Sequence, residues 1–290
     1  MSPARHVLLL LTGVAILAAQ DATAPPSPVL VYTRDPLRIP VECRAADFEA
    51  ANVQCSPEDP CQVFLELTAV EAVGSKVFLA GNLHTGAATL ASLVLFSDDG
   101  GGRWREPFQR FPGASAEAMQ FLNEQQGWIA VQPQQQFPTD PFLMSTSDGG
   151  VRWQNRRIFA EDGRAGLLQQ FRFDSPQHGF VLIDRSQSGR GVDRYELYET
   201  LTGAASWQLR ETSSRPIEPK WSERRPPEWR LRADARAKTY EVERRIGATW
   251  RRMANFRTDL AQCKELQSPL RPAPPPPDPA EDPDPRNPRN

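Results

Sequence analysis

A short polar turn followed by tryptophan recurs along the chain, and this repeat constrains the fold more than any other feature. Residues 97–104 (SDDGGGRW) return as residues 146–153 (TSDGGVRW), 49 positions later. Weaker copies occupy residues 200–207 (TLTGAASW) and 245–250 (RIGATW), whose tryptophans follow at intervals of 54 and 43 residues. A period of about 50 residues indicates an array of similar structural units.

A second element repeats between these turns. Residues 121–131 (FLNEQQGWIAV) align with residues 173–183 (FDSPQHGFVLI) at an offset of 52, and helical periodicity is nearly absent. Each unit therefore contains four short apolar segments separated by turn signals, which is typical of a propeller blade. We predict an all-β fold, a small β-propeller of about four four-stranded blades, or five if residues 28–45 contribute one.

The composition of the turns explains how they would fold. The glycines allow positive φ at the hairpin tip, the Asp carboxylates can accept hydrogen bonds from turn amides, and the tryptophan ring can fill the core between blades. We expect Asp99 and Asp148 at hairpin tips, with Trp104 and Trp153 buried. The residues predicted to build the turns are Ser97, Asp99, Gly101, Trp104, Thr146, Asp148, Gly150, Trp153, Trp207 and Trp250.

Residues 97–104 and 146–153 resemble the Asp box, or BNR repeat, whose general form is Ser/Thr-x-Asp-x-Gly-x-Thr-Trp. Two departures stand out: arginine precedes the tryptophan at Arg103 and Arg152, and Thr202 replaces aspartate in the third copy. Asp boxes occur in sialidases, in sortilin-type receptors and in exported proteins similar to photosystem II assembly factors, and the last group is the most similar. The resemblance implies a propeller over roughly residues 60–260, with the boxes as fold elements away from any active centre, and it leaves function open.

The N-terminus predicts export. An apolar run of about 13 residues ends at Ala19 after a short basic stretch, and it is too short to cross a bilayer as a helix. We therefore expect a signal peptide, no membrane span, and a periplasmic or extracellular location. The predicted parts are a signal peptide at 1–19, a flexible segment at 20–30, the propeller at 31–265 and a disordered Pro-rich tail at 266–290.

All four cysteines follow the signal peptide, and an even number in an exported protein indicates disulfides. Cys55 and Cys61 enclose a turn-rich loop, so pairing them would leave Cys43 and Cys263 to join the two ends of the repeat array. The alternative is a local N-terminal knot in which Cys43 pairs with Cys55 or Cys61. The spacing fits no common zinc site, so we expect no metal and no cofactor.

No complete catalytic constellation is visible, and the prediction leans towards a protein that is not an enzyme. Residues 37–40 (LRIP) resemble the sialidase motif whose arginine, here Arg38, grips the substrate carboxylate, but leucine replaces the usual aromatic residue. The resemblance also requires further arginines and a Tyr/Glu pair that the sequence does not identify. We predict a non-catalytic binding scaffold or assembly factor; the alternative is a degenerate sialidase-like glycoside hydrolase or a carbohydrate-binding protein. His84 and His178 each lie in an apparent loop without a companion.

One region suggests a partner. Residues 220–257 hold twelve basic residues against five acidic ones, interleaved with tryptophan and tyrosine, in a chain of net charge −2. We expect this region to attract another protein or an anionic polymer, with alternation along solvated strands as the simpler interpretation. Nucleic acid is not expected for an exported protein. The Gln/Pro insertion at 132–141 is either a recognition loop or surface padding.

Overall fold

Antiparallel β-sheet makes up nearly all of the protein. The computed structural model describes residues 28–107, 110–134, 139–159, 166–186, 194–219, 227–264 and 266. Within these residues there is a single short helix, α1 (Ala45–Ala50). The strands form four main sheets arranged like the blades of a propeller, in agreement with the predicted fold class.

Two of the sheets have the predicted four strands. The second sheet contains β7 (Ala114–Phe121), β8 (Gly127–Pro133), β9 (Phe142–Thr146) and β10 (Gln154–Arg157). The third sheet contains β11 (Leu167–Phe173), β12 (Gly179–Asp184), β13 (Tyr195–Thr200) and β14 (Gln208–Ser213). Each pairs consecutive strands in sequence order, so each unit of the repeat folds on itself.

The register of these two sheets explains the repeated phenylalanine and glycine. Gly127 lies opposite Phe121 and Thr146, and in the same way Gly179 lies opposite Phe173 and Thr200. A Cβ atom on Gly127 would come within 2.6 Å of the Phe121 ring, so the ring covers the glycine and leaves no space for a larger residue.

The first and fourth sheets depart from the simple repeat. The first sheet has the strand order β18-β2-β3-β4-β6, so the last strand of the chain joins its edge. The fourth has three strands. The bounds are β18 (Asp259–Cys263), β2 (Cys61–Val73), β3 (Lys76–His84), β4 (Thr89–Ser97) and β6 (Phe111–Pro112) in the first sheet, and β15 (Trp229–Asp234), β16 (Thr239–Ile246) and β17 (Thr249–Arg257) in the fourth.

The N-terminal segment does not form a fifth blade. Its strand β1 (Leu30–Val31) pairs only with β5 (Arg103–Trp104), the short strand that follows the first turn. Further along, Leu37 forms a parallel bridge with Phe256 of β17. The segment therefore attaches to the first and fourth sheets.

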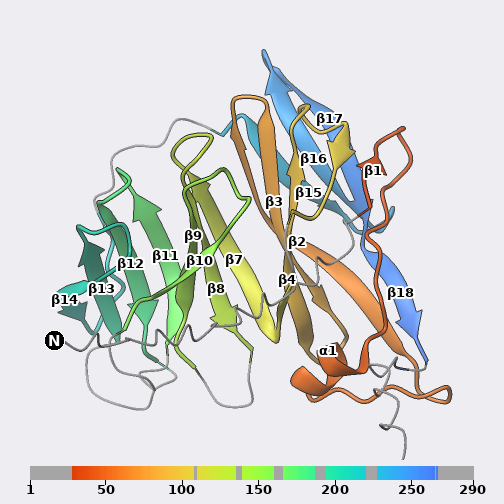
Figure 1. The fold of residues 1–290 in the computed structure, drawn as a ribbon, viewed down its shortest axis with the longest axis horizontal. Coiled ribbons are helices and arrows are strands. Elements are labelled where there is room, and N and C mark those ends of the chain that lie inside the picture. The colour runs from red at the N-terminus through yellow and green to blue at the C-terminus, as the bar shows by residue number, and fades with distance from the viewer. Residues whose placement is uncertain are drawn as a thin grey trace, which may run out of the picture.

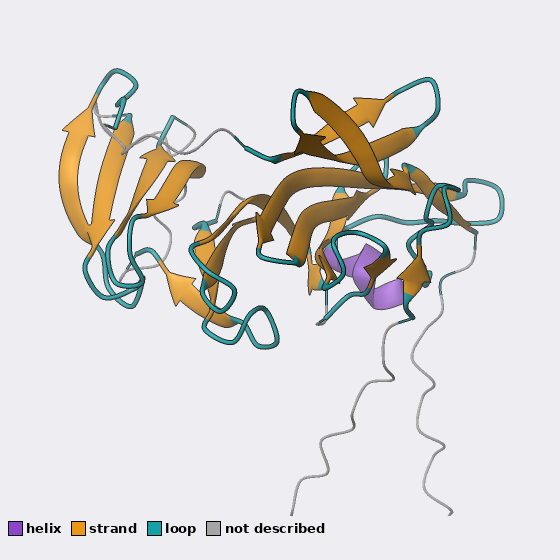
Figure 2. Cartoon of the chain, turned by 90° about the horizontal axis from the view of Figure 1, so that it is seen from above, coloured by secondary structure: helices purple, strands orange, loops and turns teal. Residues whose placement is uncertain are grey.

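The four sheets form an arc in the order third, second, first, fourth (Figure 1). Neighbouring sheets pack through aromatic side chains: Phe78 stacks on Phe121 with ring centroids 4.0 Å apart, and Trp128 stacks on Phe173 at 3.8 Å. Trp104 contacts Phe256 of the fourth sheet in an edge-to-face arrangement. Among the described residues, the third and fourth sheets lie at opposite ends of the arc, as both views show (Figure 2).

The ends of the array are joined where the first and fourth sheets meet. Cys43 is bonded to Cys263 with a Cα–Cα distance of 5.6 Å, across 220 residues. Cys55 is bonded to Cys61 and closes the loop before β2. The structure thus has the long-range pairing rather than the local knot, and the arc stays open between sheets that are consecutive in sequence.

The predicted signal peptide, and the predicted tail beyond Leu266, lie outside the described residues. None of the helices in the described ranges is long and apolar enough to cross a membrane.

Candidate functional site

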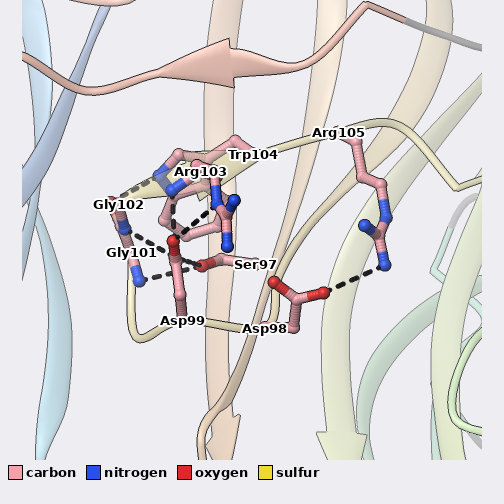
Figure 3. Close-up of polar contacts among 8 residues, drawn as sticks. All are labelled: Ser97, Asp98, Asp99, Gly101, Gly102, Arg103, Trp104 and Arg105. Atoms are coloured by element: carbon pink, nitrogen blue, oxygen red, sulfur yellow. Dashed lines mark hydrogen bonds and ion pairs between the residues drawn. The ribbon is translucent and has the colours of Figure 1, made fainter.

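The turn at residues 97–104 is held by one carboxylate and one hydroxyl (Figure 3). Asp99 Oδ1 accepts hydrogen bonds from the backbone N–H groups of Gly102 and Arg103, each at 2.9 Å, and from Ser97 Oγ at 2.9 Å. Ser97 Oγ in turn accepts the N–H of Gly101, whose φ of 107° suits glycine. Burial raises the pKa of Asp99, but the hydrogen bonds from Arg103, Ser97 and Gly102 outweigh it and lower that pKa to about 2.

The turn at residues 146–153 has the same geometry. Asp148 Oδ1 accepts the N–H groups of Val151 and Arg152, and Thr146 Oγ1 takes the place of the serine hydroxyl. The backbone hydrogen bond from Arg152 is the main cause that lowers the pKa of Asp148. Both carboxylates are thus occupied by their own turns, which leaves them poorly suited to acid–base chemistry at neutral pH.

The two tryptophans that follow these turns differ in burial. Trp104 is 0% exposed and its Nε1 donates to Gly101 O at 2.9 Å. Trp153 makes the corresponding bond to Gly150 O at 3.1 Å, but it is half-buried, edge-on to Phe121. The expectation of full burial is therefore met at Trp104 and is wrong at Trp153.

The third turn keeps the backbone geometry with weaker groups. Ala204 N–H donates to Thr200 Oγ1 at 3.1 Å, and Ser206 N–H donates to Thr202 Oγ1 at 2.9 Å. A hydroxyl thus stands where the other turns have a carboxylate. Trp207 is half-buried, and its Nε1 is buried without a hydrogen-bond partner in the described part of the chain.

The fourth copy folds differently, because residues 245–250 form the short hairpin between β16 and β17. Gly247 adopts a φ of 62°, and Thr249 Oγ1 donates to Ile246 O at 3.2 Å; no carboxylate takes part. Trp250, expected to follow a polar turn into the core, instead lies half-buried beneath the guanidinium of Arg230, 4.2 Å from the ring centroid. The sequence lacks an acceptor for the turn amides here, so a plain hairpin forms.

The hairpin between β16 and β17 carries arginines that no carboxylate of the described ranges neutralises. We define the cationic hairpin as residues 244–251. Arg244 and Arg251 lie directly opposite each other across β16 and β17, and Arg245 lies opposite Trp250. All three arginines are exposed, and none lies within 4.0 Å of a carboxylate in the described ranges. Ile246 at the tip is also exposed.

The other arginines on the strands of the fourth sheet are paired. Glu241 and Glu243 are buried on this sheet, and each is held by two guanidinium groups. Arg230 Nε lies 2.7 Å from Glu243 Oε2, while Arg232 and Arg252 both contact Glu241. The predicted basic region thus contains arginines paired with Glu241 and Glu243, the cationic hairpin, and the exposed Arg236 and Lys238 of the β15–β16 turn, while residues 220–226 lie outside the described part.

The sialidase-like reading of Arg38 finds no support in its contacts. Its guanidinium donates to the backbone oxygen of Leu260 on β18. A Tyr/Glu pair does exist, since Tyr198 donates to Glu196 at 2.6 Å, and Arg185 binds the same carboxylate at 2.8 Å. That cluster was not predicted; it is buried in the third sheet, at the other end of the arc from β18 (Figure 1).

Two of the three histidines, His84 and His178, lie in the described residues. His84, expected in a loop, is the last residue of β3 and stacks on Phe64, and His178, expected without a companion, has its Nε2 3.0 Å from Glu199 Oε1. No group of three or more potential metal-binding side chains occurs among the described residues. The Gln/Pro insertion contributes Gln132, whose Oε1 accepts the N–H of Leu168 at 3.4 Å, and its residues 135–138 are not described.

Comparison with protein-family models and with curated proteins finds no match. Among solved structures, the chain is similar to a GH74 xyloglucanase from Xanthomonas campestris (17% identity, TM-score 0.34, 47% of this chain and 18% of that one). It is also similar to a PL25 ulvan lyase (9%, 0.41, 77% and 56%) and to YCF48 from Cyanidioschyzon merolae (15%, 0.34, 65% and 59%). The chain therefore spans less than two thirds of the length of each of these proteins.

Proposed function

We propose that this protein is an exported, non-catalytic binding scaffold of the Asp-box type, and that the cationic hairpin binds an acidic partner protein. The observation that carries the proposal is the pair Arg244 and Arg251, which lie opposite each other with no carboxylate partner among the described residues; Arg244 also lies over the ring of Trp229, 5.7 Å from its centroid. Like charges directly opposite each other in a sheet are destabilising, and exposed guanidinium groups beside apolar side chains are typical of protein interfaces. An acidic partner would relieve the repulsion.

The composition of the hairpin favours a protein over a polysaccharide. Ile246 is 45% exposed at the tip, and the half-buried Trp250 lies on the next strand. An acidic polypeptide with apolar side chains can use both kinds of contact, whereas a polyuronate has no apolar side chain to pack on Ile246.

The test is binding of a synthetic peptide of alternating aspartate and leucine, measured at low and physiological salt. The Arg244→Gln/Arg251→Gln variant should lose about tenfold in affinity, mainly through slower association. The matched control, Arg236→Gln/Lys238→Gln, removes two charges from the exposed β15–β16 turn of the same sheet and should bind like the wild type. Equal losses in both variants, or a loss of polygalacturonate binding in Arg244→Gln/Arg251→Gln as large as the loss of peptide binding, would overturn the proposal.

The proposal that the protein is not an enzyme rests on side chains that already form hydrogen bonds within the chain. The turn carboxylates accept backbone amides, and Arg38 is held by Leu260 rather than by a substrate-facing cluster. We expect no turnover of aryl sialosides or common aryl glycosides by the purified protein. Turnover that disappears in Arg38→Ala would contradict this and support the glycosidase alternative.

A further inference from the structure

A polar groove lies between the second and third sheets. One wall is formed by the end of β9, the turn at residues 146–153 and the strand β10. The other wall is formed by two loops of the third sheet, at residues 176–177 and 202–203. Its volume of about 520 Å³ falls within the range of roughly 300–1,000 Å³ that is usual for small-molecule sites.

The lining of this groove consists mainly of groups that hydrogen-bond in both directions. Side-chain amides and hydroxyls both donate and accept, so they match the hydroxyl groups of a sugar. The lining exposes more polar than apolar surface, and its apolar residues are Trp128 and Pro176. The neutral polar residues of the lining are Gln126, Ser145, Thr146, Ser147, Gln154, Gln177 and Thr202.

Two arginines give the groove a positive charge. Arg156 is half-buried and oriented by Ser145 Oγ at 3.0 Å and Gln154 Oε1 at 2.6 Å, while its Nη1 has no partner among the described residues. Arg152 has a side chain that is 89% exposed, and its Nε lies 3.4 Å from Asp148 Oδ2. Asp148 also accepts two backbone amides, and the lining of the groove contains this one carboxylate and two guanidinium groups.

The wall of the groove also includes an unsatisfied buried donor. Trp128 lines the groove, is 3% exposed, and has its Nε1 buried without a hydrogen-bond partner in the described chain. Its ring is fixed by stacking on Phe173. Buried donors are normally satisfied, so an unsatisfied one in a site wall is consistent with an acceptor that is supplied from outside the chain.

The corresponding place between the first and second sheets is occupied by the chain itself. Lys76, which holds the repeat position of Gln126, donates through Nζ to Glu124 O at 3.2 Å. Glu124 in turn holds the repeat position of Pro176. Lys76 thus occupies, between the first and second sheets, the place that Gln126 holds in the lining of the groove.

We propose that this groove binds a saccharide that carries a carboxylate, with Arg152 and Arg156 holding the carboxylate and the surrounding amides and hydroxyls holding the sugar hydroxyls. A planar guanidinium group can bind a carboxylate through two hydrogen bonds. The groove has two such groups, whereas Asp148 is the single carboxylate that would repel the ligand. This site is separate from the cationic hairpin, and the inference does not depend on the partner proposed for that hairpin.

The experiment is a calorimetric titration of the full chain with trigalacturonate, using maltotriose as the neutral probe of the same length. We expect trigalacturonate to bind and maltotriose to bind at least about tenfold more weakly. Arg152→Gln and Arg156→Gln should each lower the affinity for trigalacturonate about tenfold. Arg152 is exposed, so its variant tests the proposal without disturbing the fold.

The repeat supplies the matched control. Arg103 occupies the same position in the turn at 97–104 and contacts Asp99 there at 3.0 Å, as Arg152 contacts Asp148. Arg103→Gln should leave the affinity for trigalacturonate unchanged, and so should Arg244→Gln/Arg251→Gln. The proposal fails if trigalacturonate does not bind, if maltotriose binds equally well, or if Arg103→Gln weakens binding as much as Arg152→Gln.

Discussion

The first and third sheets are built from the same repeat, yet they are secured very differently. The first sheet is joined by β18, crosslinked through Cys263, and followed by a turn whose tryptophan is fully buried. The third sheet ends in β14, which is almost entirely exposed, and its turn uses Thr202 and a tryptophan with an unsatisfied Nε1. The stabilising interactions of this arc are therefore concentrated where the chain ends meet, and the far end is less constrained.

The largest effect should come from the bond that joins the chain ends. Replacing Cys43 and Cys263 by serine should lower the free energy of unfolding by about 5 kcal/mol, because the bond closes a very long loop. The Cys55→Ser/Cys61→Ser control opens a loop of six residues and should cost about 2 kcal/mol. Urea unfolding measures both values, and equal losses would mean that the junction is not the main point of stabilisation.

The tryptophans of the first and third turns provide the next comparison. Trp104→Ala removes a fully buried ring and should cost about 4 kcal/mol, while Trp207→Ala removes a half-buried ring with an unsatisfied donor and should cost about 1–2 kcal/mol. Both free energies of unfolding can be measured by urea denaturation followed by circular dichroism. Similar costs would show that the third sheet is as tightly packed as the first.

Removing the polar side chain of the first turn and that of the third turn should lower the free energy of unfolding by amounts that differ less. Asp99→Ala removes a carboxylate that accepts from two backbone amides, Ser97 and Arg103, and should cost about 2 kcal/mol. Thr202→Ala removes a single hydroxyl and should cost about 0.5–1 kcal/mol. Equal losses for Thr202→Ala and Asp99→Ala would contradict the claim that the first turn is held more strongly than the third.

The sequence predicted the hairpin turns, because the hydrogen bonds that hold each turn join residues that are close together in the sequence. Glycine, aspartate and tryptophan at fixed spacing specify a hairpin with its own hydrogen bonds, so the turns of the first three units could be read directly. The fourth unit shared only Gly247 and Trp250 with that pattern, and its arginines gave the turn amides no acceptor. Trp250 was therefore misassigned.

The opening of the arc and the groove could not be predicted, because both depend on contacts between sheets. Whether the third and fourth sheets meet depends on how each packs on its neighbour, which a repeat pattern does not encode. Arg156 and Gln177 lie on different sheets and carry no shared motif, and the repeat at residues 121–131 does not mark Trp128 as part of a binding site. The one available signal was the change from Lys76 to Gln126 at the same repeat position.

Acidification should act on the first turn and spare the third. The pKa of Asp99 falls from 3.8 to about 2 on folding, so the carboxylate stabilises the folded state above about pH 4 and loses that contribution as the pH falls towards 2. After allowance for solvent screening, the loss should be about 1–2 kcal/mol. The measurement is the difference in free energy of unfolding between wild type and Asp99→Asn at pH 5 and at pH 2.5. That difference should shrink on acidification, whereas the difference between wild type and Thr202→Ala should stay constant, because a hydroxyl does not titrate in this range. A constant difference for Asp99→Asn would mean that the turn does not depend on the carboxylate charge, and the two turns would then be equivalent.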